Sequence, residues 1–235
     1  MRALTPQPRL VEQVYHAILT EITEGKLPPN SRLIQDELAE AYGVSRQPVQ
    51  QALLLLRSHG LVSDAPRRGL VVAALDEEHA RNLYKIRSVL EGLACRMAAE
   101  NGAARARTEG PAIIAQGREA IESGSVAQQI EMDTRFHCFL YELSGNPLIA
   151  ETTKPHWDYL RRVMGEVLRE GDSVPGALWN EHAGILKAVG EGDGDAAEAL
   201  ARKHICGASD IFVARLKAQR EGRIAASTKS MTDCA

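Results

Sequence analysis

Apolar residues recur at helical spacing along most of this chain, and only one short region is typical of β-strands. Before residue 60, three amphipathic stretches are separated by turn-forming residues, at 25–30 and at Gly43. Residues 61–62 and 70–72 are then rich in leucine and valine, and the segment 64–69 between them has the composition of a hairpin tip. Three helices followed by a hairpin form a winged helix-turn-helix, which we expect over residues 1–75.

Beyond residue 75 the strand signals stop. Helices are expected at about 76–101, 107–123, 126–144, 147–170, 176–191 and 194–220, separated by glycine and proline breakers. The fold class is therefore mostly α, with the winged helix-turn-helix followed by an antiparallel bundle of about six helices over residues 76–221. The tail, residues 222–235, is polar and rich in small residues, and we expect it to be disordered.

The composition fits a soluble globular protein, with 44% hydrophobic and 25% charged residues. No apolar run is long enough to cross a bilayer, and the first residues lack the apolar core of a signal peptide. We therefore expect a cytoplasmic protein with no membrane partner. Four cysteines (Cys95, Cys138, Cys206 and Cys234) form no CxxC pair, which predicts free thiols. Cys138 and Cys206 fall in apolar helical stretches and are expected to be buried.

Charge alone does not identify a nucleic-acid binder. The formal net charge is −3, and residues 1–75 carry eight Lys or Arg against seven Asp or Glu. A DNA-binding function has to be argued from a motif instead.

The third helix, residues 46–59, has that motif's chemistry. Its inward stripe is Val49, Ala52, Leu53 and Leu56, which leaves Arg46, Gln47, Gln50 and Gln51 on the outward, N-terminal part. A recognition helix touches base edges with this part, and arginine suits guanine as glutamine suits adenine. Arg67 and Arg68 at the hairpin tip could reach phosphates or the minor groove. The alternative is an ordinary solvated helix face.

Ionisable residues occupy core stripes in three helices of the bundle. Asp133 and His137 share a stripe with Ile130 and Leu140, and His182 and His204 hold similar positions in later helices. Burying such groups without partners is costly, and a divalent metal bound by Asp133, His137, His182 and His204 would satisfy all four. Nitrogen and oxygen ligands suit Zn²⁺, Ni²⁺ or Mn²⁺. The alternative is a set of unrelated core histidines with hydrogen-bond partners. We assign no role to His16, His59, His79 and His156.

Nearly all of residues 10–74 resemble the GntR family of bacterial regulators. The resemblance is carried by Gly25–Pro29, Leu33–Ala39, Gly43–Val49, Ala52-Leu53 and Gly60–Val62, in that order. It implies a DNA-binding winged helix and a homodimer on a pseudo-palindromic operator. The chain departs from the family's usual residues at Asn30, where glycine is usual, near Asp36, where an arginine is common, and at Gln50-Gln51, where Arg-Glu is common. Arg46 is retained.

Residues 77–215 resemble the FCD ligand-sensing domain of the FadR branch, in its shorter, VanR-like version. The motifs are Asp133-x-x-x-His137, Leu143–Pro147, Glu181-His182, Gly192-Asp193 and His204, and the first helix fits through Arg87, Leu90, Glu91 and Ala94. The resemblance implies that Asp133 and the three histidines bind a divalent ion and that the effector is a carboxylate-bearing metabolite. Four ligands leave open positions for that carboxylate if the ion is six-coordinate.

Arg87 is the candidate effector-binding residue. It lies at the edge of an apolar stripe formed by Leu83, Ile86, Leu90, Leu93 and Met97, from which it could clamp an anion. The alternative is an i, i+4 salt bridge with Glu91.

Together these patterns predict a transcription regulator and not an enzyme, with repression by operator occupancy as the working assignment. A small organic acid at the metal site would change how the bundle sets the two winged helices and so release DNA. Three alternatives stay open. The ion itself could be the signal, the bundle could be a metal-dependent enzyme, or His137, His182 and His204 could bind the anion without a metal.

Overall fold

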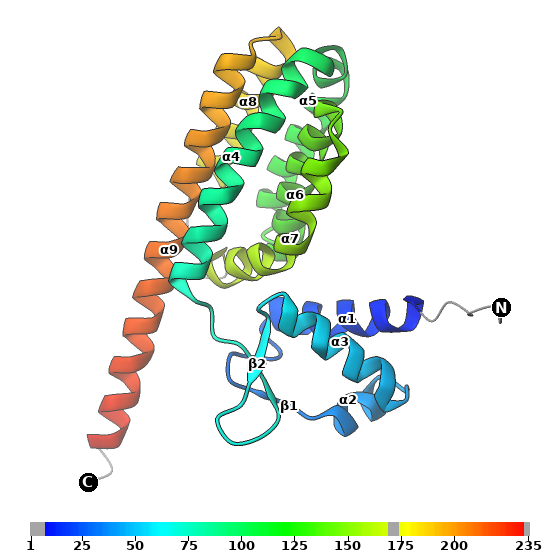
Figure 1. The fold of residues 1–235 in the computed structure, drawn as a ribbon. Helices are drawn as coiled ribbons and strands as arrows, with labels where there is room; N and C mark the ends of the chain where they lie inside the picture. Colours follow the sequence, from blue (N-terminus) through cyan, green and yellow to red (C-terminus); the bar gives the residue numbers. More distant parts are fainter. Residues whose placement is uncertain (1–7, 169–173, 233–235) are drawn as a thin grey trace, which may run out of the picture. The chain divides into compact units, whose positions relative to one another are not determined.

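The computed structural model describes residues 8–168 and 174–232, which are mostly helical. The chain divides between Leu75 and Asp76 into two compact units, with Asp158–Arg162 grouped with the first unit. Figure 1 shows the elements of each. None of the described helices is long and apolar enough to span a membrane.

The N-terminal unit is a winged helix. Its helices are α1 (Pro8–Thr23), α2 (Gln35–Ala41) and α3 (Arg46–Ser58). Its strands β1 (Arg32–Leu33), β2 (Val62–Asp64) and β3 (Leu70–Val72) form an antiparallel sheet in the order β1-β3-β2. The predicted hairpin is thus confirmed, whereas β1 was missed. Two residues are too few to show an alternating pattern, and β1 exists because Leu33 pairs with Leu70 of β3.

The recognition helix α3 buries the stripe that its sequence predicts. Val49, Ala52, Leu53 and Leu56 are fully buried in the core of this unit. Ser45 stands at the N-cap of α3, but its side chain makes no capping hydrogen bond. Asn30 has a φ of 69°, in the left-handed region that asparagine tolerates better than most residues. That conformation explains why asparagine can stand where glycine is usual.

The C-terminal unit confirms the six-helix bundle. Its helices are α4 (Glu77–Asn101), α5 (Ala103–Glu122), α6 (Val126–Ser144), α7 (Pro147–Leu168), α8 (Val174–Glu191) and α9 (Gly194–Thr232). α5 begins four residues earlier than predicted. The largest difference is at the end, where α9 continues to Thr232 although a disordered tail was expected from residue 222. Residues 223–232 contain no glycine or proline to stop a helix, and residues 233–235 lie outside the described residues.

α4 is the central helix of this bundle. It packs against α6, α8 and α9, while α5 packs against α6 and α8; Figure 1 shows α4 and α9 running side by side. Phe136, Leu140, Ile185, Val189 and Ala201 are among the core residues that fill the space between these helices. The packing brings buried faces of α4, α6, α8 and α9 together, and the polar residues on those faces form the site described below.

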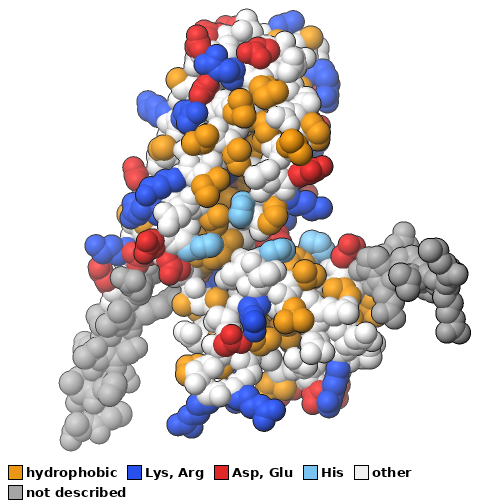
Figure 2. All heavy atoms as spheres, viewed as in Figure 1, with side chains coloured by type: hydrophobic (Ala, Val, Ile, Leu, Met, Phe, Trp, Pro, Cys, Tyr) orange, Lys and Arg blue, Asp and Glu red, His pale blue; other side chains and the backbone are white. Residues whose placement is uncertain are grey.

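The apolar stripe predicted for α4 does not form the core. Of its members only Leu83 is buried, while Ile86 and Leu93 are 54% and 40% exposed. Val89, which was not part of the predicted stripe, is 51% exposed on the same helix. In Figure 2, hydrophobic side chains lie along the face where α4 runs. The helix instead buries small residues together with Arg87 and Glu91, which can enter the core because their charges neutralise each other.

The described cysteines are free, as predicted. Cys95 is buried and Cys138 half-buried, but Cys206 is exposed, so the expectation of a buried thiol there was wrong. His204 and Ile205 occupy the inward side of α9 at this point, which turns Cys206 outward. Cys234 lies outside the described residues.

Candidate functional site

Three helices of the bundle bring three buried histidines together. His137 of α6, His182 of α8 and His204 of α9 each place a ring nitrogen within 4.8 Å of the others. Nε2 of His182 lies 3.0 Å from Nε2 of His204. Asp133, one turn before His137, places Oδ1 3.9 Å from Nε2 of His137 and 3.7 Å from Nε2 of His182. The three histidines singled out in the sequence therefore converge, and Asp133 lies beside two of them.

Two carboxylates orient the imidazole rings. Nδ1 of His137 lies 3.0 Å from Oε2 of Glu91, and Nδ1 of His204 lies 2.8 Å from Oε2 of Glu181. A carboxylate that accepts from Nδ1–H leaves the lone pair of Nε2 free to face the cluster. Sequence reasoning missed both of these roles. The signal available for Glu91 was a carboxylate on the face of α4 that the apolar stripe does not occupy, and Glu181 had no signal beyond its place beside His182.

Burial keeps His137 and His182 in the neutral form, which is the form that binds metal. It lowers the pKa of His137, and it holds the pKa of His182 well below its usual value with help from His204 and His137. Both rings are therefore neutral near pH 7. Burial opposes ionisation of Glu91, but the charges of His137 and Arg87 outweigh it and lower the pKa of this carboxyl to about 2. Arg87 supplies that charge at neutral pH.

The donor set fits a divalent ion. Three imidazole nitrogens lie within 4.8 Å of one another, with the Asp133 carboxylate beside two of the rings, and imidazole and carboxylate are ligands that Zn²⁺, Ni²⁺ and Mn²⁺ accept. Nε2 of His137 is buried and has no hydrogen-bond partner. A buried ring nitrogen in that condition is costly unless something binds to it, so the residues present fit a metal ion.

Arg87 lies beside this cluster and is almost fully buried. Its Nε donates to Oε1 of Glu91 at 2.9 Å, so the salt bridge considered as the alternative is present. The Tyr141 hydroxyl donates to the same oxygen at 2.5 Å. The guanidinium carbon of Arg87 lies 4.6 Å from the ring centroid of Trp157, a cation–π distance. Sequence reasoning missed Tyr141 and Trp157.

Two buried hydrogen-bond donors near Arg87 have no partner. Nη2 of Arg87 and the hydroxyl of Tyr84 are both buried without a partner. Burial raises the pKa of the Tyr84 hydroxyl, which therefore stays protonated and able to donate. Two unpaired donors beside a cluster of metal-ligand type are an arrangement suited to a small anion.

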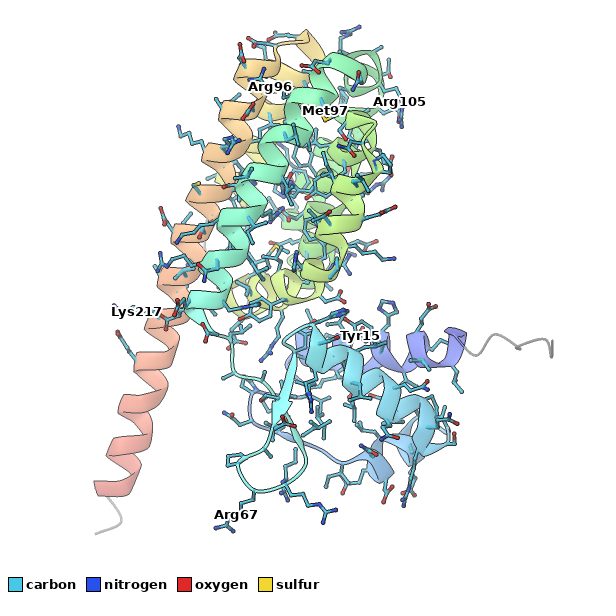
Figure 3. The ribbon with its side chains drawn as sticks, viewed as in Figure 1. Tyr15, Arg67, Arg96, Met97, Arg105 and Lys217 are labelled. Atoms are coloured by element: carbon cyan, nitrogen blue, oxygen red, sulfur yellow. The ribbon has the colours of Figure 1, made fainter. Side chains whose placement is uncertain are left out.

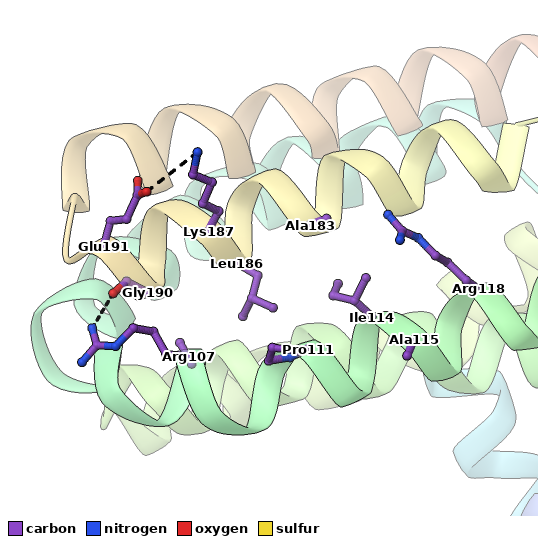
Figure 4. Close-up of a pocket in the computed structure, with 11 residues that line it drawn as sticks. Arg107, Pro111, Ile114, Ala115, Arg118, Ala183, Leu186, Lys187, Gly190 and Glu191 are labelled. Carbon is purple, nitrogen blue, oxygen red and sulfur yellow. Dashed lines mark hydrogen bonds and ion pairs between the residues drawn. The ribbon is translucent and has the colours of Figure 1, made fainter.

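A hollow of about 480 Å³ lies in the bundle between α5 and α8 (Figure 4). Its cationic side chains already have contacts. Arg107 donates to the carbonyl of Gly190 at 2.6 Å and Lys187 pairs with Glu191 at 3.8 Å. Arg118 lies 3.4 Å from the side-chain oxygen of Asn180. Its other lining residues are mostly apolar, so we place no anion there.

The DNA-reading candidates are all exposed. Arg46, Gln47, Gln50 and Gln51 lie on the outward side of α3, and Arg67 and Arg68 lie in the loop between β2 and β3. Figure 3 shows Arg67 at the end of this loop, pointing away from the unit. Arg46 is not isolated, because its Nη2 donates to Oδ2 of Asp36 at 2.7 Å and its Nε contacts Oδ1.

A hollow of about 450 Å³ joins α2, α3 and the wing. Arg32, Arg46 and Arg68 line it, together with Asp36. Arg32 holds its place by donating to the carbonyl of Arg68 at 3.0 Å. Arg32 was not predicted as a functional residue, because it becomes part of this face only through the pairing of β1 with β3.

A winged helix followed by an all-helical bundle places the chain in a class of two-unit DNA-binding proteins, and the second unit here gathers three buried histidines. The comparisons identify the family. The family model of bacterial regulatory proteins of the gntR family matches residues 10–72, and that of the FCD domain matches residues 82–206. The chain belongs to the GntR family and carries an FCD domain, so it is a DNA-binding transcription regulator.

Named relatives agree with this assignment. The HTH-type transcriptional repressor RspR of Escherichia coli K12 is 27% identical over 86% of this chain and 88% of its own length. An uncharacterized HTH-type regulator from an unstable DNA locus of Streptomyces ambofaciens is 32% identical over 77% and 75%. In the solved structures, E. coli McbR/YncC has the same fold, with a TM-score of 0.74 and 24% identity over 88% and 98% of the two chains.

Proposed function

We propose that this chain is a cytoplasmic, homodimeric repressor whose affinity for operator DNA is controlled by a small organic acid bound beside a divalent metal ion. The observation that carries the proposal is the convergence of Asp133 and three buried histidines next to the unpaired donor of Arg87. The printed name of RspR, a repressor, favours repression over activation.

Asp133, His137, His182 and His204 would hold the metal, which supplies open coordination positions for a carboxylate. Arg87 would hold the same carboxylate through Nη2, and Tyr84 is placed to donate a second hydrogen bond. Glu91 and Glu181 would keep the rings of His137 and His204 oriented. Because the metal ligands come from α6, α8 and α9, binding there links three helices of the bundle.

The metal assignment is tested by elemental analysis of the purified protein after exposure to Zn²⁺, Ni²⁺ or Mn²⁺. One ion per chain is expected for the wild type and for His16→Ala, which removes an exposed histidine of α1. His182→Ala should reduce the content severalfold or more, because it removes a central ligand. Equal metal content in all three proteins would contradict the site.

The same samples separate the alternatives. Weak, exchangeable metal whose addition alone changes DNA affinity would favour metal sensing. An absence of metal together with carboxylate binding that His182→Ala abolishes would favour direct anion binding by the histidines. Turnover of a carboxylate by the loaded protein would favour an enzyme.

The dimer is proposed to form through a row of exposed apolar side chains on α4. Ile86, Val89 and Leu93 are spaced three and four residues apart and exposed at 54%, 51% and 40%, and Leu200 of α9 is exposed at 39%. A row of large apolar side chains on the surface of a helix favours a protein partner. A second copy presents the same row, and twofold pairing matches a palindromic operator.

The DNA assignment is tested by selecting bound duplexes from a random library with the metal-loaded protein at near-physiological salt. An enriched palindrome is expected, with Arg46, Gln47, Gln50 and Gln51 reading base edges and Arg67 and Arg68 holding the backbone. Arg46→Ala should weaken binding to the selected duplex by tenfold or more, because one good bidentate base contact is worth about 1–3 kcal/mol. Adding an organic acid that binds the protein should then release the duplex. Unchanged affinity for the duplex in its presence would overturn the proposed control of DNA binding by the acid.

A further inference from the structure

The guanidinium of Arg46 is paired with the carboxylate of Asp36. Asp36 lies in the first turn of α2, and Arg46 is the first residue of α3. Nη2 of Arg46 donates to Oδ2 of Asp36 at 2.7 Å, and Nε contacts Oδ1. Two side-by-side contacts fix the plane of the guanidinium as well as its position. The pair stands in solvent, with 73% and 57% of the two side chains exposed.

We propose that Asp36 is a positioning and specificity-determining residue that restricts Arg46 to reading the edge of a guanine. The inference rests on the proposed function, in which α3 reads DNA. It deepens that function by assigning the sequence preference of one contact to a residue outside the recognition helix.

Counting the donors of the guanidinium supports this role. Arginine has five N–H groups, and the contacts with Asp36 involve Nε and one hydrogen of Nη2. Both hydrogens of Nη1 and the second hydrogen of Nη2 remain. These form the outer edge of the fork, which matches the two acceptors O6 and N7 of guanine. Asp36 therefore occupies one side of the guanidinium and leaves the base-reading side free.

The charges of the surrounding hollow support it as well. Arg32, Arg46 and Arg68 line this hollow, and Asp36 is the only carboxylate among its lining residues. A phosphate near Arg46 would also approach Asp36 and be repelled by it. Arg32 instead donates to the carbonyl of Arg68, and these two arginines remain suited to the backbone. Asp36 thus favours contact of Arg46 with a base and leaves contacts with phosphates to Arg32 and Arg68.

The test uses a matched pair of variants, Asp36→Asn and Glu37→Gln. Both remove one negative charge from the exposed first turn of α2, but only Asp36 contacts Arg46. Each full-length, metal-loaded protein is titrated with the duplex selected by the wild type, with single-base-pair variants of it, and with unselected random duplex, over a range of salt. Circular dichroism and urea unfolding check that the variants fold alike.

Arg46→Ala first identifies the G·C pair that Arg46 reads, because the preference at that pair disappears. Asp36→Asn should lower the preference for guanine at that pair about tenfold and leave the other pairs unchanged. It should also bind random duplex more tightly, with a salt slope steeper by about 0.9, as expected for one more phosphate contact. Glu37→Gln should keep the preference at the pair and the slope of the wild type.

Three results would overturn the inference. Unchanged preference and slope in Asp36→Asn would make the pair an ordinary surface ion pair. A sharper guanine preference would mean that Asp36 withholds Arg46 from DNA instead of aiming it. Equal changes in Asp36→Asn and Glu37→Gln would reduce the effect to net charge. A wild-type protein that enriches no sequence and binds no duplex at low salt would contradict the proposed function itself, and the inference would fall with it.

Discussion

At the residue scale, Glu91 connects the two halves of the candidate sensing site. Its Oε1 accepts from Arg87 and Tyr141, and its Oε2 lies against Nδ1 of His137. The side chain is 1% exposed and carries a full negative charge, since the pKa of the carboxyl is about 2. The same carboxylate therefore neutralises the buried arginine and orients the ring of one histidine of the cluster.

Replacing Glu91 should affect folding and metal binding together. Glu91→Gln leaves the charge of Arg87 buried without a counter-ion, a change that costs about 3–5 kcal/mol of unfolding free energy in comparable cases. It should also weaken metal affinity about 10- to 100-fold, as the loss of an orienting partner does. Urea unfolding of the metal-free protein and a competition titration with a chelator measure the two effects.

Glu181→Gln is the control for this prediction. Glu181 orients His204 in the same way, but its side chain is 45% exposed and faces no buried arginine. Its replacement should weaken metal binding while changing the unfolding free energy of the metal-free protein by less than about 1 kcal/mol. Equal losses of stability in the two variants would show that Glu91 has no special role in neutralising Arg87.

At the scale of the elements, the contact between α5 and α8 depends on the absence of a side chain. Trp179 of α8 lies against Gly117 of α5, and a Cβ built on Gly117 would fall inside the tryptophan ring. Trp179 also packs on His182, with ring centroids 4.8 Å apart. The close approach of the two helices is thus coupled to the position of one histidine of the cluster.

Gly117→Ala should therefore destabilise the bundle even though alanine favours helices. Displacing a large ring from a packed core costs about 1–3 kcal/mol, which exceeds the gain of about 0.5–1 kcal/mol from replacing a helical glycine. Gly184→Ala in α8 is the control, because nothing lies within 4 Å of a Cβ at that position. Thermal unfolding should show a lower Tm for Gly117→Ala and an equal or higher Tm for Gly184→Ala. The reverse order would contradict the packing.

At the scale of the whole molecule, α4 serves both sides of the bundle. One face carries Arg87 and Glu91 into the core, and the other presents Ile86, Val89 and Leu93 to solvent. A helix with one polar-lined buried face and one apolar exposed face is explained if a second copy covers the exposed face. The helix that holds the candidate effector contact would then also form the interface.

Ile86→Asp should separate the dimer, since it places a charge in the proposed apolar interface. Light scattering at graded concentrations should give a dimer for the wild type and a monomer for the variant, and binding to the selected palindrome should weaken with it. Leu148→Asp is the control, because Leu148 is 64% exposed in α7 and lies outside the stripe. Dissociation by both variants, or by neither, would contradict an α4 interface.

Much of the fold, and the convergence of the three histidines, was predictable because both depend on local spacing. The helices follow apolar periodicity and glycine breaks, and Asp133, His137, His182 and His204 stood out as ionisable residues on core stripes. The residues that support them did not stand out. Glu181, Tyr141 and Trp157 gain their roles from neighbours between 23 and 70 positions away in the chain, a separation over which periodicity carries no information.

The sequence by itself determined the winged helix, the six-helix bundle and the four candidate ligands, since each of these follows from patterns within a single helix or hairpin. Only the tertiary structure decided which face of α4 is buried, that Asp36 holds Arg46, and that Glu91 joins Arg87 to His137. The physical reason is that an apolar stripe indicates that a helix face is covered, but it does not indicate which other part of the protein, or which partner, covers it. Whether a charge can enter the core depends on the charge that another helix, or another turn, places opposite it.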